Sequence, residues 1–452
     1  MAPSLFHAVV ADAMVWLLCL IALLRLARLS ITHAATAYLA FHALFVSFRA
    51  IAIVNGAATL FSWPGASAVT GQEISRAVML CDLVLAAMTC GWILAAHRAA
   101  NSQVAAARDS SRALNPRIFK AVAGTAIPLG CIAMLLWSRF PGLPIHEMSG
   151  DWANSNWVVI AQTWTGLSLL ALIYWYGFRP GLVMSIAIYF SWVVYQGNFR
   201  FRLLIPLILL VQIYLDRRGR RWPKLWGIAA LVATGLLFFP LKGIGQRLQS
   251  NEPLDDLWQS TRAEIVNVMS GDHPDETILD QLASAITLAD AHGRLYWGRT
   301  YAGLLTVAVP RQWWRQKPSL TEYQKEISTA DRPMAQNGMV VTMLGEFYLN
   351  FSYFGVVVLS FVVAYLTGSW FHAAYLHGYF TLPHFTYLLV ACNLIQVYRD
   401  GLISLFVFTI INMMPLTLIA ALHLLRSPVD TFAEPILQTS RVREVTGREL
   451  SV

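Results

Sequence analysis

The chain has 452 residues, of which 57% are hydrophobic and 13% are charged, and its formal net charge is +8. Soluble domains carry about 25% charged residues, so the composition excludes a water-soluble globular protein. The positive charge does not indicate a nucleic-acid partner, because most basic residues lie in short clusters between long apolar runs. The sequence therefore predicts an all-α polytopic integral membrane protein.

Eleven apolar runs approach the length of a membrane-spanning helix, which is about 17–25 residues. In chain order the predicted spans are 9–28, 34–54, 74–96, 118–137, 157–177, 180–196, 199–215, 224–240, 352–371, 384–398 and 402–425.

Basic residues predict the orientation of these spans, because loops rich in Lys and Arg stay in the cytoplasm. Clusters follow the first, third, fifth, seventh and last spans, and with eleven spans all of them lie on one side. The N-terminus is then predicted outside and the tail 426–452 inside.

Four regions follow from this topology: N-terminal spans over 1–240, an outward loop over 241–351, C-terminal spans over 352–425 and the tail. Within the loop, Asp272–Glu276 precedes an amphipathic pattern from Ile278 onward. Helix capping explains this acidic cluster better than a metal site does. Two apolar stretches, 301–310 and 339–349, are too short to span, and we interpret them as a re-entrant pair.

Two groups of cations lie on the predicted outward side. Arg200 and Arg202 occupy a helix start, where one can enter a cavity while the other anchors at the interface; snorkelling of both is an equal alternative. Arg311 and Arg315, four residues apart, share a helical face, and with Lys317 they form a fork suited to phosphate or pyrophosphate. The neighbouring tryptophans either stack on sugars or lie in the headgroup belt.

Glu346, Asn350 and Tyr353 follow the outward loop at spacings of four and three, which predicts one shared helical face. Glu346 is either a general base or the partner of an arginine. Arg399 and Asp400 form a local pair between the last two predicted spans, on the same side. No glycine-rich phosphate loop with lysine occurs, and Asp255–Asp256 is not a DxD motif, so we expect no nucleotide, cofactor or metal.

These segments resemble the Wzy-type O-antigen and oligosaccharide repeat-unit polymerases of bacteria. The resemblance rests on 198–202, 310–318 and 345–351, in the family's order and followed by Arg399, and it covers about the second half of the chain. In that family the Asn-Phe pair is commonly followed by glycine. Here Ser352 follows, and the next glycine is Gly355.

The resemblance implies a GT-C-like helical glycosyltransferase of surface polysaccharide biosynthesis, including lipopolysaccharide. Such an enzyme joins oligosaccharide units carried on undecaprenyl pyrophosphate, at the periplasmic face of the bacterial inner membrane. It needs no ATP or nucleotide sugar, and a chain-length regulator protein is an expected partner alongside membrane lipid.

The hypothesis that follows assigns roles to nine residues. The cations expected to contact the pyrophosphate are Arg311, Arg315 and Arg200, with Lys317, Arg202 and Arg399 as further candidates. Glu346 removes the acceptor's proton or orients an arginine, and Asn350 and Tyr353 contact sugar. The alternatives are an O-antigen ligase, which transfers glycan to lipid A core, and a lipid-linked oligosaccharide flippase or transporter.

Overall fold

The computed structural model of the chain describes residues 4–61, 68–106, 113–138, 152–196, 201–229, 244, 253–270, 277–306, 314, 326–329 and 340–425. These residues form helices joined by turns. The one β-type contact among them is an isolated bridge between Ala113 and Thr381. The all-α prediction is therefore confirmed for the described part of the chain.

Five of the described helical segments are long and apolar enough to cross a membrane, namely Leu5–Leu26, Ala34–Val54, Gly71–Ala100, Pro116–Leu136 and Met343–Leu376. The pair Leu402–Asn412 and Met414–Leu425, bent by 83°, would make a sixth. A helical membrane protein is supported, but the described residues do not establish eleven spans. Two of the helices at predicted spans, α7 and α8, have only 17 residues each, and 230–240 lies outside the described residues.

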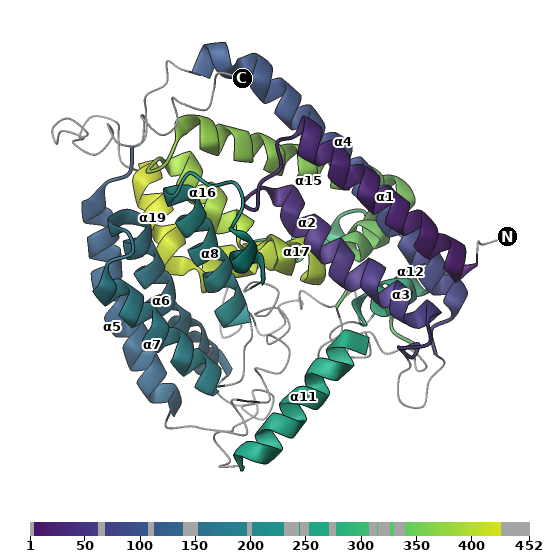
Figure 1. Cartoon of the computed structure of the whole chain (residues 1–452), viewed down its shortest axis with the longest axis horizontal. Coiled ribbons are helices and arrows are strands. Elements are labelled where there is room, and N and C mark those ends of the chain that lie inside the picture. The colour runs from purple at the N-terminus through teal and green to yellow at the C-terminus, as the bar shows by residue number, and fades with distance from the viewer. Residues whose placement is uncertain are drawn as a thin grey trace.

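One group of helices packs around a shared hydrophobic core on the right of Figure 1. It contains α1 (Leu5–Leu26), α2 (Ala34–His42), the π-helix η1 (Ala43–Ser47), α3 (Phe48–Val54), α4 (Gly71–Ala106) and α12 (Ile278–His292). Large apolar side chains on α1 stay exposed at intervals of mostly three or four residues, including Val10, Met14, Leu17, Ile21 and Leu24. This spacing gives α1 an apolar stripe suited to lipid.

A second group has its own core on the left of Figure 1. Its helices are α5 (Pro116–Ser138), α6 (Trp152–Tyr176), α7 (Pro180–Gln196), α8 (Phe201–Arg217), α16 (Leu382–Ala391) and α19 (Met414–Leu425). Close crossings depend on glycine here. A Cβ at Gly130 would collide with Thr165, and one at Gly166 would collide with the Tyr189 ring. Small residues let membrane helices approach in this way.

Helix α15 (Met343–His377) takes part in both cores, since Val356 belongs to the first and Phe371 to the second. It crosses α4 closely: a Cβ at Gly91 would collide with the carbonyl oxygen of Phe361, and Gly368 lies against Trp92. The crossing fixes the position of α15 against the first group.

Ser352 interrupts α15 with φ 57° and ψ −159°, which is not helical. This backbone region is essentially restricted to glycine. Gly355 follows Ser352 by three residues and lies against the Phe351 side chain, so a Cβ at position 355 would collide with that side chain. The segment before the interruption is buried from Val341 to Asn350 and coincides with the second predicted re-entrant stretch.

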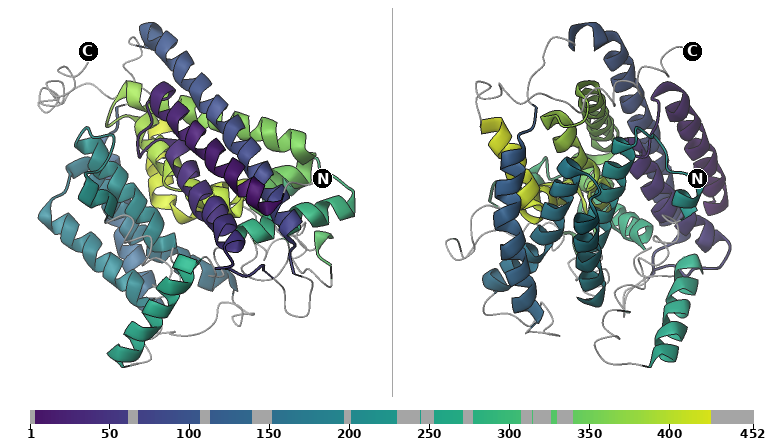
Figure 2. Two further views of the ribbon diagram at one scale, coloured as in Figure 1. Left: turned by 45° about the vertical axis from the view of Figure 1, so that its right-hand side comes forward. Right: turned by 60° about the vertical axis from the view of Figure 1, so that its left-hand side comes forward.

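The region after α8 contributes α11 (Leu254–Ser270), α12 and α13 (Arg299–Thr306). Helix α12 occupies the segment where an amphipathic helix is predicted, and it ends at Gly293 with φ 65°. The predicted capping residues 272–276 and the end of the first re-entrant stretch, 307–310, lie outside the described residues. Figures 1 and 2 show α11 projecting away from both helix groups.

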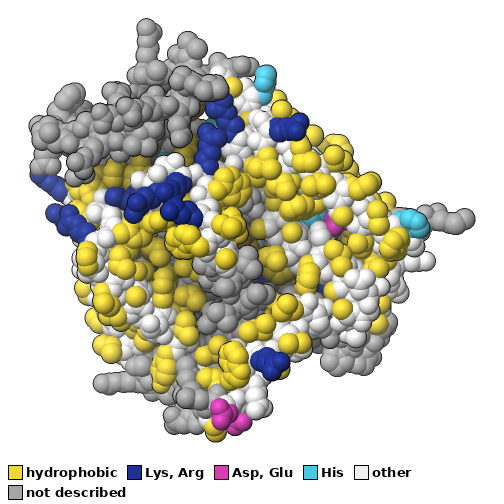
Figure 3. Space-filling view, viewed as in Figure 1, with side chains coloured by type: hydrophobic (Ala, Val, Ile, Leu, Met, Phe, Trp, Pro, Cys, Tyr) yellow, Lys and Arg dark blue, Asp and Glu magenta, His cyan; other side chains and the backbone are white. Residues whose placement is uncertain are grey.

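The C-terminal helices are more broken than predicted. The predicted span 384–398 is divided between α16 and α17 (Leu394–Asp400), and 402–425 between α18 (Leu402–Phe406), η3 (Val407–Asn412) and α19. Hydrophobic side chains cover much of the described surface in Figure 3, while Lys and Arg gather toward its upper side.

Candidate functional site

Glu346 lies in the first turn of α15, where Thr342 caps the helix by accepting a hydrogen bond from Gly345 N at 3.2 Å. Its side chain is buried, and its Oε2 accepts a hydrogen bond from Leu402 N at 2.7 Å. The carboxylate also packs on Gly401, whose φ of 98° and missing Cβ both permit this approach. The start of α15 is thus joined to the turn between α17 and α18.

Arg399 and Asp400 belong to the same turn. Their predicted local pair is present, with Arg399 Nη1 at 3.2 Å from Asp400 Oδ1, and Gln396 also donates to Asp400. Because Gly401 follows directly, the turn that carries this pair lies beside the Glu346 carboxylate. The structure therefore brings Glu346 and Arg399 into one neighbourhood from segments that are far apart in the sequence.

Asn350 is fully buried, one helical turn after Glu346. Its Nδ2 donates to Thr300 Oγ1 at 2.7 Å and to Glu346 O at 2.8 Å, and its Oδ1 accepts from Gly298 N at 2.8 Å. These bonds hold the turn before α13 against α15. Direct contact of Asn350 with a sugar stays a prediction, and it would require some of these bonds to be exchanged.

Tyr353 does not join Glu346 and Asn350, because the interruption at Ser352 separates it from the helical turn that carries Asn350. Its hydroxyl is 2.6 Å from Arg76 Nε. The same guanidinium donates to Tyr348 Oη at 2.9 Å and contacts Asp290 Oδ2 at 2.5 Å. The predicted shared face of Glu346, Asn350 and Tyr353 is therefore wrong for Tyr353, since the spacing rule assumes an unbroken helix.

Arg76 is a site candidate that the sequence reasoning missed. It lies in the second turn of α4 and its side chain is 38% exposed. A guanidinium has five N–H donors, so the three contacts do not exhaust it. The signal in the sequence is an arginine near the start of an apolar span, on the predicted outward side.

Arg49 and Asp280 form a buried ion pair between α3 and α12. Arg49 Nε lies 2.8 Å from Asp280 Oδ2, and both side chains are almost fully buried. Arg49 also donates to Thr59 O at 2.6 Å, and Phe61 N donates to Asp280 Oδ1 at 3.1 Å. The pair fixes α12, and with it the region next to Glu346, on the first helix group.

Arg202 lies in the second group, where its Nη1 donates to Gln162 Oε1 at 2.9 Å. Gln162 belongs to α6, so this bond holds Arg202 against the second group, whereas Glu346 is bonded to the turn between α17 and α18. The remaining predicted cations, Arg200, Arg311, Arg315 and Lys317, lie outside the described residues.

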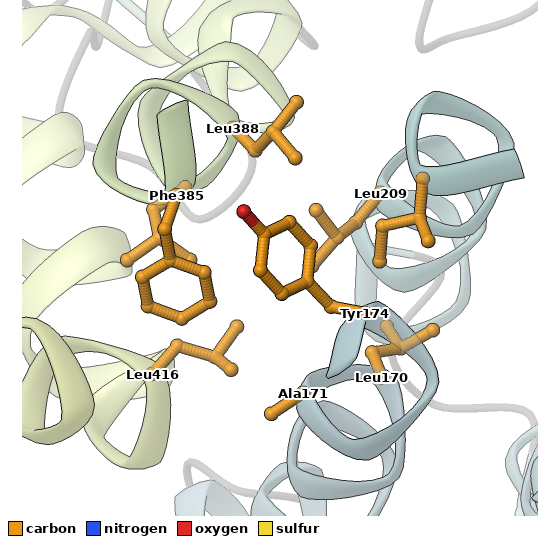
Figure 4. Close-up of a pocket in the computed structure, with 9 residues that line it drawn as sticks. Leu170, Ala171, Tyr174, Leu209, Phe385, Leu388 and Leu416 are labelled. Atoms are coloured by element: carbon orange, nitrogen blue, oxygen red, sulfur yellow. The ribbon is translucent and has the colours of Figure 1, made fainter. Parts of the chain in front are cut away.

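A small apolar pocket between α6, α8, α16 and α19 is shown in Figure 4, with the Tyr174 ring among leucine side chains. Its lining consists of Leu170, Ala171, Tyr174, Leu209, Ile213, Phe385, Leu388, Leu389 and Leu416. It belongs to the core of the second group and contains none of the predicted site residues.

Next to this pocket, a buried polar network joins four helices. His384 contacts Asp216 Oδ2 at 3.1 Å and Tyr174 Oη at 3.1 Å, and Tyr375 donates to Asp216 at 2.8 Å. Each of these groups has a partner, so we interpret the network as a structural tie of α6, α8, α15 and α16.

No family model matches the chain, and no curated protein or solved structure is significantly similar to it.

Proposed function

We propose that the chain is a membrane glycosyltransferase that polymerises lipid-linked oligosaccharide repeat units. The growing glycan would move from undecaprenyl pyrophosphate to a sugar hydroxyl of an incoming unit. The observation that supports this most is the meeting of Glu346 with the turn that carries Arg399. A carboxylate and cations at one end of apolar helices suit a reaction between an alcohol and a lipid pyrophosphate.

The cations have the role of stabilising the departing pyrophosphate. Arg311 and Arg315, with Arg200, are the main candidates, and Lys317, Arg202 and Arg399 are secondary ones. Arg76 is a further candidate, because its guanidinium is partly exposed while it donates hydrogen bonds to the Tyr348 and Tyr353 hydroxyls. Arginine suits this role because its donors match phosphate oxygens in pairs.

Glu346 has two candidate roles. As a general base it would take the proton of the attacking hydroxyl, which requires the carboxylate to be reached from the side not held by Leu402 N. As a positioning residue it would hold the Arg399 turn in place through that same hydrogen bond. Asn350 supports Glu346 indirectly, through the bond to its backbone carbonyl, and Tyr353 would contact sugar.

The proposed setting is the bacterial inner membrane with the site facing the periplasm. Eleven spans of a GT-C-like fold, with 241–351 outside, would give this orientation. The basic residues after α1 and α8 would then lie in the cytoplasm, in keeping with the positive-inside rule. Lipid-linked oligosaccharide is the proposed substrate, and a chain-length regulator is a proposed partner.

The test uses cells that lack their own polymerase and express the chain with a matching lipid-linked unit. Arg311→Ala with Arg315→Ala should abolish polymer and leave the single-unit product. Arg294→Ala removes an exposed arginine near α12 that has no proposed role, and it should leave polymer formation unchanged. Full-length polymer from the double variant would refute the proposed role of these arginines.

Glu346→Gln and Glu346→Ala separate the two roles of the carboxylate. A base requires the charge, so both variants should be inactive. A positioning residue requires only an acceptor, so Glu346→Gln should keep activity and Glu346→Ala should lose it. Near-normal activity of both would exclude both roles. Glycan found on lipid A core would instead indicate a ligase, and units that cross the membrane unjoined would indicate a flippase or transporter.

A further inference from the structure

Three ionisable side chains from three apolar helices meet inside the first helix group. They are Asp12 in α1, His42 at the end of α2 and Asp82 in α4. The exposed fractions are 1%, 0% and 8%. His42 Nε2 is 2.7 Å from Asp12 Oδ1 and 3.7 Å from Asp82 Oδ1. One nitrogen or oxygen of each residue lies within 4.8 Å of the others, a separation that one ion can bridge.

The hydrogen bonds of this cluster are incomplete. Asp12 Oδ2, Asp82 Oδ1 and His42 Nδ1 are buried and have no hydrogen-bond partner among the residues that the structure describes. Ser47 Oγ, at the end of η1, is another buried atom without a hydrogen-bond partner in the described part of the chain. A buried carboxylate oxygen that accepts no hydrogen bond is costly, so the unpartnered oxygens of Asp12 and Asp82 are available for an additional positive ligand.

The charges of the cluster also favour an additional positive ligand. Two carboxylates inside membrane-spanning helices require compensation, and one histidine can supply at most a single positive charge. Arg49 follows His42 by two helical turns in the sequence, but its guanidinium is engaged by Asp280. A π-helical turn begins directly after His42, and such turns occur frequently at functional sites.

We propose that Asp12, His42 and Asp82 bind a divalent metal ion of the first transition row, with Zn²⁺ as the best match. One imidazole nitrogen and two carboxylate oxygens are ligands that Zn²⁺ accepts, whereas Mg²⁺ and Ca²⁺ prefer oxygen alone. The ion would neutralise the two carboxylates and clamp α1, α2 and α4 together. The site is independent of the proposed glycosyl transfer, since none of its ligands belongs to the Glu346 neighbourhood.

The test uses the full chain purified in detergent, treated with chelator and desalted. Titration with Co²⁺ should give a saturable visible absorption band at one ion per chain, and Zn²⁺ should abolish the band by displacement. Zn²⁺ in excess over its Kd should also raise the Tm by several degrees, because it binds only the folded state. Wild-type protein without saturable binding would overturn the proposal. Stability that responds to pH but not to Zn²⁺ would do the same.

Variants locate the ion. Asp82→Asn and His42→Gln should each weaken Zn²⁺ binding by more than about tenfold, since the loss of a supporting group alone costs that much at metal sites. Asp216→Asn alters the other buried Asp–His pair, in the second helix group, and should leave Zn²⁺ affinity unchanged. Wild-type Zn²⁺ affinity in Asp82→Asn and His42→Gln would place the ion elsewhere and overturn the assignment. If a variant does not fold, the wild-type titration still decides.

Discussion

The substitution Ser352→Gly should stabilise the protein, although it removes a side chain from a long helix. Ser352 holds φ 57° and ψ −159°, a combination that costs a residue with a Cβ about 1–3 kcal/mol. Glycine removes this strain but adds freedom to the unfolded chain, which costs about 0.4–1 kcal/mol. The net expectation is an increase of about 0.5–2 kcal/mol in the free energy of unfolding.

Thermal unfolding in detergent, followed by tryptophan fluorescence, measures the effect. A gain of that size should raise the Tm by about 1–8 °C, given about 2–4 °C per kcal/mol for medium-sized domains. Ser352→Ala is the first control, because it removes the hydroxyl and keeps the Cβ, so the strain should persist and the Tm should change little.

Ser369→Gly is the second control, since it makes the same substitution inside the regular part of α15. There glycine should lower the stability by about 0.5 kcal/mol, because a helix interior disfavours it. Opposite signs for Ser352→Gly and Ser369→Gly are the expected result. A lower Tm for both would refute the reasoning, because it would mean that residue 352 is helical in the folded protein.

Three further substitutions test contacts elsewhere. Gly401→Ala should lower the stability by about 1–3 kcal/mol and polymer formation by about 100-fold, because the new Cβ strains the turn and displaces Glu346. Unchanged activity would contradict the placement of that carboxylate. Asp280→Ala should cost about 3–5 kcal/mol in chemical unfolding, whereas Arg49→Met combined with Asp280→Leu should recover most of it; equal losses would contradict a buried pair. Gly91→Val should cost about 1–3 kcal/mol by separating α4 from α15, and an unchanged Tm would show that the helices do not cross there.

Much of the fold follows from the length and position of apolar runs. The predicted spans 9–28 and 34–54 correspond to Leu5–Leu26 and Ala34–Val54. Helix breaks are harder to predict, because hydropathy averages over a window and does not register one residue. Ser352 is an example: its apolar neighbours indicate a continuous span, yet its backbone is not helical.

The candidate site was predictable only in part. Glu346 is predicted to be a general base or the partner of an arginine, and the structure gives it a partner that neither role names, the backbone N–H of Leu402. Backbone groups carry no signature in a sequence, so this contact could not be predicted. Arg49 was noticeable as a charge within a span, but its partner Asp280 lies 231 residues away, and one sequence alone does not relate the two.

The Arg49–Asp280 pair has a consequence for chimeric proteins. It ties α12, which lies between two sets of spans in the sequence, to helices at the beginning of the chain. A recombinant in which only the stretch between α8 and α15 comes from another protein would inherit one member of the pair without the other, unless the donor supplies a matching acid. Crossover points that keep residues 49 and 280 from the same parent should therefore yield folded proteins more often than crossovers placed at the ends of that stretch.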